Sequence, residues 1–249
     1  DFLGNTRESI ASEKAGILRQ NIPAIIGEPD PPTSLMKAIE TQTVKAFFLH
    51  KDFNFTENKN NWSWQSRNKT YLTLPKPNIL LQNAATALAA IETMQSLLPI
   101  NLKAIRNGLS TVFVPGRFEM TTYQGKKILF DVAHNPAACA ALADNLKKHF
   151  PNEKFSAVFS MLKNKDISTC LNQLKPFIDH WHIAPVTHER ATQISGLKDA
   201  CKKVQIEPAS FHPTLESAFT SAIRSEDTLL IFGSFVTVAN IKRLLRPKQ

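Results

Sequence analysis

The segment Asp131-Val-Ala-His134-Asn-Pro136 combines three features that could bind an anionic ligand. Asp131 contributes a carboxylate, His134 contributes an imidazole, and the residues that follow are typical of the first turn of a helix. Free N–H groups at the start of a helix attract anions. We therefore expect a ligand-binding corner at this point of the chain. The sequence equally allows a structural role, in which Asp131 and Asn135 fix a turn and His134 makes only a local contact.

The elements around this segment would place it at the edge of a sheet. Apolar residues at 128–130 and at 132 predict a short buried strand. Asn135 is a good N-cap, Pro136 suits the first helical position, and residues 137–150 have the pattern of an alanine-rich amphipathic helix. The acid and the histidine would then lie at the carboxyl end of a strand, where open α/β sheets bind ligands.

Two further motifs could contribute to such a site. Arg117 follows Pro115-Gly116, and the planar fork of an arginine can hold phosphate oxygens in a bidentate way. An interdomain salt bridge is the structural alternative for Arg117. Gly233 and Ser234 follow an apolar strand and begin the last predicted helix, so they could form a second anion-facing helix start beside the first, or only a cap.

Local spacing assigns no special chemistry to Lys14 or Asn83. Lys14 has the pattern of a surface lysine, and Asn83 has that of an ordinary residue at a helix start. No pair of glycines has the GxxxxGK[ST] spacing. The sequence therefore contains no phosphate-binding P-loop of its own.

The composition is that of an ordinary globular protein with an excess of basic residues. Apolar residues make up 43% of the 249 residues, charged residues make up 20%, and the net charge is +9. This balance permits nucleic acid, phosphates or polycarboxylates as partners. The basic residues are scattered, and the clusters at 147–148 and 202–203 fall in the last turns of predicted helices, where the helix dipole favours cations. The distribution therefore argues against a nucleic-acid-binding stripe.

Other bulk features narrow the class of protein. No run approaches the ~20 apolar residues that a membrane span needs, and the amino terminus has no signal-peptide layout. The three cysteines, at positions 139, 170 and 201, show no CxxC or CxxH spacing, so the sequence indicates neither a disulfide framework nor a zinc site. We expect buried thiols in a monomeric cytoplasmic protein that binds small molecules and neither nucleic acid nor membranes.

The order of predicted elements indicates two α/β regions with a boundary at Pro115-Gly116, which together break a helix and start a new strand pattern. Residues 1–114 form a mixed region of helices, short apolar strands and a hairpin. Residues 115–249 contain six strand-like runs, most of them separated by helical patterns. This βαβ rhythm predicts a Rossmann-like, mostly parallel sheet that is covered on both faces.

Four finer expectations concern single elements. Asn5-Thr-Arg-Glu8 matches a capping box for a helix that runs through Ile17, and residues 51–61 are polar and turn-rich. Residues 82–98 predict one long helix, and residues 182–185 predict one of the six strands.

Five stretches together resemble one family, the folate-handling Mur-type ligases, meaning dihydrofolate synthase and folylpolyglutamate synthase. Each stretch is weak alone, but their order and rough spacing agree along essentially the whole chain. The stretches are Leu3-Gly4 with Ile10-Ala-Ser-Glu-Lys-Ala-Gly-Ile17, Asn83-Ala-Ala-Thr-Ala-Leu-Ala-Ala90, Pro115-Gly-Arg-Phe-Glu119, Asp131-Val-Ala-His-Asn-Pro136 and Phe232-Gly-Ser-Phe235.

The resemblance implies an ATP- and magnesium-dependent amide ligase, with a monovalent cation as a further candidate ion. The γ-phosphate of ATP would pass to the carboxylate of dihydropteroate or of a folate glutamate, and the amine of L-glutamate would then attack the acyl phosphate. Residues 1–114 would be the end of a Mur-type central ATPase domain. Residues 115–249 would be the carboxyl-terminal glutamate-binding domain.

The resemblance also implies roles for individual residues. Asn83 matches the contact to adenine, and Arg117 matches the phosphate clamp. Asp131 would hold the ribose or an interdomain network. His134 would lie near the γ-phosphate and the incoming glutamate, and Ser234 would lie near the glutamate.

Lys14 matches the family lysine that becomes carbamylated, which would turn a cation into an oxygen ligand for magnesium. In the family an Asp-His pair precedes this lysine helix, and the P-loop half of the ATPase domain lies further upstream. Neither is present in the sequence. We therefore expect a carboxyl-terminal fragment that cannot turn over alone and in which Lys14 is unmodified.

Two other interpretations stay open at this point. A fragment of a cell-wall Mur ligase would share the architecture but use a different amino acid and a nucleotide-linked acceptor. A basic nucleic-acid-binding module without catalytic function would bind DNA or RNA with a steep salt dependence.

Overall fold

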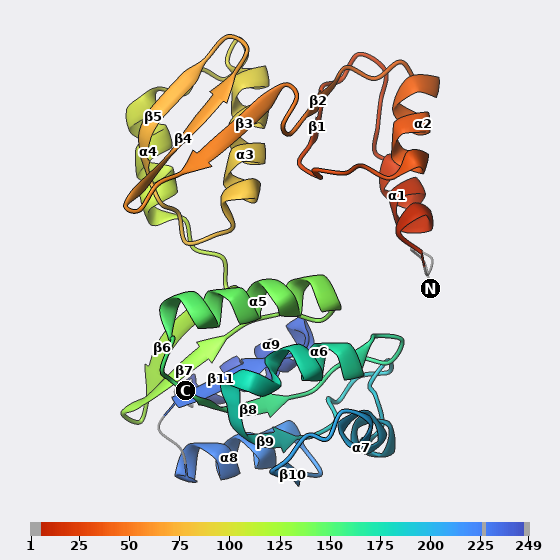
Figure 1. Cartoon of the computed structure of the whole chain (residues 1–249), viewed down its shortest axis with the longest axis vertical. Coiled ribbons are helices and arrows are strands. Elements are labelled where there is room, and N and C mark those ends of the chain that lie inside the picture. The colour runs from red at the N-terminus through yellow and green to blue at the C-terminus, as the bar shows by residue number, and fades with distance from the viewer. Residues whose placement is uncertain (1–5, 226–227, 247–249) are drawn as a thin grey trace. The chain divides into compact units, whose positions relative to one another are not determined.

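A computed structural model describes residues 6–225 and 228–246 of the chain (Figure 1). The chain divides into two compact units, residues 1–113 and 114–249, and each is described by itself below. In the described ranges, every helix is too short or too polar to cross a lipid bilayer.

The first unit begins with alternating helices and strands, and its two short strands pair in parallel. Glu8 on the first helix accepts hydrogen bonds from the N–H groups of Thr33 (3.1 Å) and Ser34 (2.7 Å) at the start of the second helix. The carboxylate of Glu8 thus caps α2, because the N-cap residue Pro32 has no side-chain group that can accept a hydrogen bond. The elements are α1 (Arg7–Ala15), β1 (Ala24–Ile26), α2 (Thr33–Thr41) and β2 (Ala46–Phe48).

The first unit continues with a three-stranded antiparallel sheet that packs against two helices (Figure 1). Trp62 and Trp64 alternate with polar residues on the central strand and are fully buried. The indole N–H of Trp64 donates to the carbonyl oxygen of Ala85 at 3.0 Å, which satisfies its one polar group. The elements are β3 (Phe53–Glu57), β4 (Asn61–Ser66), β5 (Thr70–Pro75), α3 (Leu81–Met94) and α4 (Leu102–Thr111).

The second unit contains a six-stranded sheet in the order β10-β9-β8-β11-β7-β6. All neighbouring strands run parallel except β6, which pairs with β7 in an antiparallel hairpin. The mostly parallel α/β sheet that the sequence predicts is thus confirmed. The strands are β6 (Glu119–Tyr123), β7 (Lys126–Phe130), β8 (Phe155–Phe159), β9 (Ile178–Ile183), β10 (Ala209–Phe211) and β11 (Thr228–Phe232).

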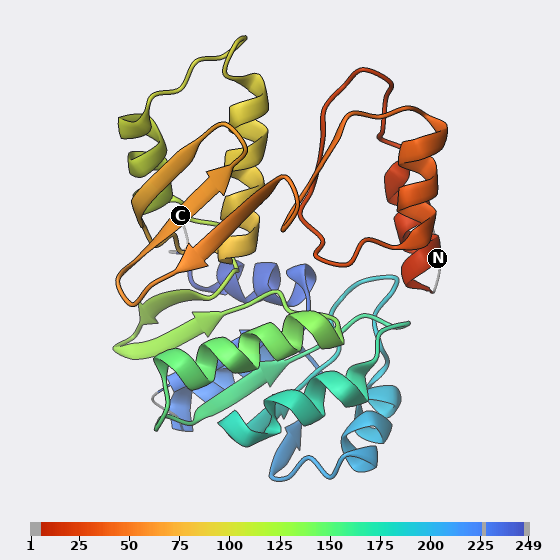
Figure 2. The ribbon, with the colours of Figure 1, turned by 45° about the horizontal axis from the view of Figure 1, so that its top comes forward.

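Helices cover both faces of this sheet, as Figure 2 shows. The first three helices bury apolar residues on one face, where all three cysteines lie as free, buried thiols. The last two helices pack on the other face. Parallel strands that are covered on both sides need continuous apolar runs, which explains why β8 is buried along its whole length. The helices are α5 (Pro136–His149), α6 (Ile167–Leu174), α7 (Ile194–Lys203), α8 (Leu215–Ser225) and α9 (Phe235–Leu244), with a 3₁₀ turn at Lys175–Phe177 after α6.

Helix α1 differs from its prediction at both ends. The capping box is formed by Thr6 and Ser9, because the side chain of Glu8 caps α2 instead. Asn5 lies outside the described residues. The helix ends at Ala15, and Ile17 beyond it is 81% exposed, so this isoleucine belongs to no buried helical face.

Three other predictions of single elements were wrong in part. The polar stretch 51–61 contains strand β3, whose Phe53 is buried between polar neighbours. Helix α3 ends at Met94 rather than at residue 98. Strand β9 begins at Ile178, well before residue 182, because its polar residues Asp179 and His180 interrupt the apolar pattern that marks a strand.

Candidate functional site

Two neighbouring strands of the second unit each lead directly into a helix. Strand β7 is followed by residues 131–135 and then α5, and we call these residues the β7–α5 corner. Strand β11 is followed by residues 233–234 and then α9, which starts at Phe235, and we call residues 233–235 the β11–α9 corner. Because β7 and β11 pair in parallel, both corners lie at the same carboxyl edge of the sheet.

Asp131 holds the backbone of the β7–α5 corner. One carboxylate oxygen accepts from the N–H of Ala133 at 2.8 Å, and the other accepts from the N–H of Phe118 at 2.9 Å. Burial raises the pKa of Asp131 above its usual value, although both backbone hydrogen bonds oppose this shift. Asn135 caps α5 by accepting from the N–H of Ala138 at 2.8 Å, and Pro136 is the first helical residue, as predicted.

One ring nitrogen of His134, Nε2, has no hydrogen-bond partner in residues 6–225 and 228–246. Its Nδ1 lies 2.8 Å from the carbonyl oxygen of Val132. A carbonyl can only accept, so Nδ1 carries the hydrogen and Nε2 of the neutral ring keeps its lone pair. The ring also lies against Phe235, with 6.2 Å between the ring centroids. The corner therefore offers Nε2 of His134 as a hydrogen-bond acceptor.

Gly233 allows the backbone of the β11–α9 corner to pass close to β8. Its φ is +115°, and an added Cβ would collide with the carbonyl oxygen of Ser160. No side chain can occupy this position without moving one of the two backbones.

The hydroxyl of Ser234 is used inside the protein. Its oxygen accepts from the N–H of Thr237 at 2.9 Å and lies 2.7 Å from the hydroxyl oxygen of the same residue. Thr237 donates its own hydroxyl hydrogen to the carbonyl of Ser160 at 2.8 Å, so the hydroxyl of Ser234 must donate to Thr237. Ser234 is the predicted N-cap of α9, and its side chain is buried.

Arg117 lies in a tight turn that is fixed to the β7–α5 corner and, through Glu119, to helix α9. The N–H of Val132 donates to the carbonyl of Gly116 at 2.8 Å, and Gly116 itself has a φ of +72°. The N–H of Gly116 donates to Glu119 at 2.7 Å, and Glu119 forms an ion pair with Lys242 of α9. The turn thus connects β7 to the helix that follows β11.

The guanidinium of Arg117 lies over the ring of Phe235, with 5.5 Å from Cζ to the ring centroid. Its side chain is exposed, and within the described ranges it has no carboxylate at ion-pair distance. The structure therefore brings together three of the predicted site residues, Arg117, Asp131 and His134, and leaves the arginine fork free.

Phe235 is the residue that the sequence analysis missed. It belongs to the Phe-Gly-Ser-Phe motif, in which only Gly233 and Ser234 were given roles. Here it is 55% exposed and contacts both Arg117 and His134. A large apolar side chain at a helix start that follows a glycine and a serine is the signal that could have identified it.

Lys14 and Asn83 belong to the first unit. Lys14 is exposed in the last turn of α1, and Asn83 is exposed in the first turn of α3. Among the residues that the structure describes, no group of three or more His, Cys, Asp or Glu side chains could hold a metal ion. The described residues alone therefore do not provide enough ligands for a metal ion. The guanidinium of Arg117 and the N–H groups at the two helix starts, in contrast, suit the phosphates of a nucleotide.

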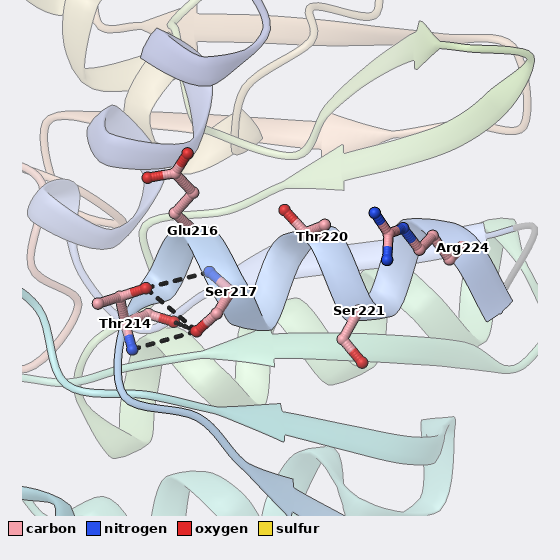
Figure 3. A pocket seen from close by; sticks show the side chains of 6 residues that line it. All are labelled: Thr214, Glu216, Ser217, Thr220, Ser221 and Arg224. Atoms are coloured by element: carbon pink, nitrogen blue, oxygen red, sulfur yellow. Dashed lines mark hydrogen bonds between the residues drawn. The ribbon is translucent and has the colours of Figure 1, made fainter.

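Two surface cavities lie on the second unit. One has a volume of about 520 Å³ and extends from Phe235 along α9 to Asn240 and Arg243, and Thr187 and His188 also line it. The other, of about 560 Å³, lies along α8. Figure 3 shows that its six side chains all come from this helix or its N-cap Thr214 and do not converge on a point. None of the predicted site residues lines it.

A family model described as the Mur ligase glutamate ligase domain matches residues 116–235. The dihydrofolate synthase/folylpolyglutamate synthase of Escherichia coli (strain K12) is 34% identical over 100% of this chain and 58% of its own length. The protein of the same name from Haemophilus influenzae is 35% identical over 96% of this chain and 59% of its own length. The chain thus spans less than two thirds of these relatives.

The chain is also similar to solved structures of proteins with these names. E. coli FolC in complex with DHPP and ADP matches with a TM-score of 0.87 and 33% identity, over 98% of this chain and 58% of that one. A bifunctional folylpolyglutamate synthase/dihydrofolate synthase from Yersinia pestis, complexed with AMPPNP and Mn ion, matches with a TM-score of 0.85 and 35% identity over the same shares. Folylpolyglutamate synthase from Mycobacterium tuberculosis, complexed with ADP, has a TM-score of 0.84 at 25% identity and covers 100% of this chain and 61% of that one.

Proposed function

Because the chain belongs to the Mur ligase family, in the branch of dihydrofolate synthase and folylpolyglutamate synthase, we propose that it serves the ATP-dependent ligation of L-glutamate to dihydropteroate or to folate glutamates. The observation that carries this proposal is the free guanidinium of Arg117 beside His134, at two helix starts on neighbouring parallel strands. Such an edge binds phosphates and carboxylates, which are the charged groups of all three substrates.

The reaction would proceed in two steps. The terminal phosphoryl group of ATP passes to the acceptor carboxylate, which releases ADP and forms an acyl phosphate. The amine of glutamate then attacks the acyl carbon, and inorganic phosphate leaves. Both steps need negative charge on the transferring phosphoryl group to be stabilised and the reactants to be held in place.

The nucleotide would contact Arg117, Asp131 and Asn83. Arg117 would hold phosphate oxygens, because its planar fork has no carboxylate partner among the described residues. Both oxygens of Asp131 accept a backbone N–H, yet each keeps a second lone pair for a ribose hydroxyl. Asn83 would contact the adenine.

The glutamate would bind near His134 and Ser234. Nε2 of His134 has no hydrogen-bond partner among the described residues, so we propose that this nitrogen faces the incoming glutamate and the phosphate of the intermediate. The hydroxyl of Ser234 gives its hydrogen to Thr237, so we propose that the N–H groups at the start of α9 contribute the donors at this position.

Magnesium would accompany ATP, and carbamylated Lys14 would contribute a ligand only with further oxygen ligands from outside the described residues. We propose that Lys14 is unmodified in this chain and that the chain alone does not ligate glutamate. A sensitive assay for ATP-dependent incorporation of labelled glutamate should stay at background. Measurable turnover by the purified chain would show this part of the proposal to be wrong.

Calorimetric titration with ADP tests the nucleotide site. Arg117→Ala should weaken ADP binding about 10-fold or more, because charge-assisted hydrogen bonds to phosphate are lost. Arg224→Ala is the matched control, since Arg224 is an exposed arginine in the cavity on α8. Equal affinities for the two variants would contradict the assigned role of Arg117.

The choice of amino acid separates the folate branch from the cell-wall branch. We propose that the chain binds L-glutamate in preference to alanine or diaminopimelate, and parallel titrations measure this preference. Tighter binding of either competitor would support a cell-wall Mur ligase instead.

We also propose that the chain acts as a monomer on small molecules in the cytoplasm, without nucleic acid as a partner. Light scattering of the chain alone checks that it is a monomer. The same measurement with added duplex DNA or RNA at low salt checks that it binds no nucleic acid. A complex that dissociates steeply with added salt would support the nucleic-acid-binding alternative.

A further inference from the structure

Phe235 is exposed at a position where the fold does not require an aromatic side chain. It is the first residue of α9, directly after the Ser234 cap, and 55% of it is exposed. Any residue compatible with the first helical turn could begin the helix here, because the cap is made by Ser234 and Thr237. An apolar ring left in contact with water at this point therefore needs another explanation.

The contacts of Phe235 supply one. The guanidinium of Arg117 lies over its ring, and the ring of His134 lies beside it at an interplanar angle of 51°. These two residues come from different segments of the chain, the turn before β6 and the corner after β7. Phe235 is thus a common contact for the arginine and the histidine to which the proposed function assigns phosphate and glutamate.

Arg117 has an alternative partner close by. The half-buried Asp131 lies nearby, and the charge of Arg117 favours the ionised form of this carboxyl. Both oxygens of Asp131 bond to backbone N–H groups, and no ion pair joins Asp131 to Arg117 in the described part of the chain. An arginine without another contact would fold towards this carboxylate and lose its free fork, because a bidentate pair uses the same N–H groups that phosphate needs.

We propose that Phe235 is a positioning residue, which holds the guanidinium of Arg117 on its ring face, beside His134 and apart from Asp131, so that the arginine fork stays available to phosphate oxygens. This inference rests on the proposed function for its consequence in nucleotide binding. The contact itself is a property of the apo chain. A cation over an aromatic face is attracted by the ring quadrupole, which leaves the N–H groups at the edge of the guanidinium pointing outward.

Two substitutions of Phe235 distinguish the effect of its aromatic ring face from the effect of its side-chain volume. Phe235→Leu keeps an apolar side chain and loses the ring face, whereas Phe235→Tyr keeps the face. Phe113→Leu is the matched control, because Phe113 is a phenylalanine of the first unit with a similar exposure of 54%. Circular dichroism and denaturation midpoints of all three establish that each variant is folded before the other measurements.

The first measurement does not depend on nucleotide. Carbon NMR of the Asp131 carboxyl gives its pKa in the free chain. In Phe235→Leu, pairing with the released Arg117 should lower this pKa relative to the unaltered chain, whereas Phe235→Tyr and Phe113→Leu should leave it unchanged. An unchanged pKa in Phe235→Leu would overturn the positioning role, because it would show that Arg117 keeps its place without the ring.

The second measurement is the affinity for ADP by calorimetry. Phe235→Leu should weaken binding about fivefold, the effect expected for one lost cation–π contact, and Phe235→Tyr should restore it. Equal weakening by Leu and Tyr would overturn the positioning role. If the unaltered chain itself binds no ADP, the proposed function fails, while the titration of Asp131 still decides whether Phe235 positions Arg117.

Discussion

The β7–α5 corner and the β11–α9 corner are built alike but expose different groups. Each follows one of two paired parallel strands and each is closed by a capping side chain, Asn135 in one and Ser234 in the other. In the β7–α5 corner the acid is tied to the backbone and the histidine keeps a free nitrogen. In the β11–α9 corner the hydroxyl is buried and the aromatic ring is exposed.

This difference shows which polar groups can reach a ligand. Asp131 and Ser234 have the residue types that suggest chemistry, yet their hydrogen bonds mainly fix the chain. Besides the second lone pair on each oxygen of Asp131, the side-chain groups that remain available in the two corners and at Arg117 are Nε2 of His134, the guanidinium of Arg117 and the ring face of Phe235 that holds it. We expect substitutions of Gly233 and Ser234 in the β11–α9 corner to lower mainly the stability of the fold. Substitutions of His134, Arg117 or Phe235 should instead weaken ligand binding.

The largest effect is expected at Gly233. Gly233→Ala should destabilise the chain by more than about 3 kcal/mol, because the new methyl group meets the carbonyl of Ser160 and φ is positive. Denaturant unfolding measures the loss. Gly125→Ala is the control, since its φ is +77° but nothing lies near its Cβ, so only about 1 kcal/mol of backbone strain is expected. Equal losses would show that the β11–α9 corner is not closely packed on β8.

Acid should act on β9, which lies between β10 and β8 in the sheet and leads into neither corner. Burial, with smaller contributions from the charges of His180 and His212, lowers the pKa of His182 to about 4. His182 is neutral in the folded chain, whereas the same side chain in the unfolded chain takes up a proton below pH 6.5. The free energy of unfolding is therefore at its full value above pH 6.5 and decreases as the pH falls towards 4. The loss amounts to at most about 3 kcal/mol. Asp131 has the opposite sign, because its raised pKa makes protonation favour the fold.

Denaturation midpoints between pH 7 and pH 4 check this assignment. His182→Leu should flatten the acid slope, and His149→Gln, a change at an exposed histidine of α5, should not. The same slope in both variants would place the acid-sensitive group elsewhere.

The smallest effects are expected from substitutions of the two N-cap residues, Ser234 and Asn135. Ser234→Ala should cost about 2 kcal/mol, because it leaves the buried N–H of Thr237 without an acceptor and removes the hydrogen bond that the hydroxyl oxygen of Thr237 accepts. Asn135→Ala should cost about 1 kcal/mol, because water can replace the lost bond at its exposed cap. Thermal unfolding of the two variants measures the difference. A larger loss for Asn135→Ala would contradict the ranking of the two corners.

Local sequence patterns were sufficient to predict both corners. A capping residue, a helix-start proline and the apolar strands before them are all short-range signals, and the structure confirms the caps at Asn135 and Ser234. The mostly parallel sheet followed from the spacing of the apolar runs.

Tertiary contacts decided what the sequence could not show. The partners of Asp131 include Phe118, which is 13 residues away, and the hydroxyl of Ser234 is committed through Thr237 to Ser160 on a neighbouring segment. Phe235 becomes a site residue only because Arg117 and His134 pack on it. In the same way, Glu8 caps a helix other than its own, so the capping box at the start of α1 could not be assigned from local signals.

NMR mapping of ADP binding on the 249-residue chain tests the central claim most directly. We predict that the largest amide shifts fall on residues 116–118, which form the turn around Arg117, and on residues 131–135 and 233–235, which form the two corners. Shifts confined to residues 214–224 around the cavity on α8, or no shifts at all, would contradict the account.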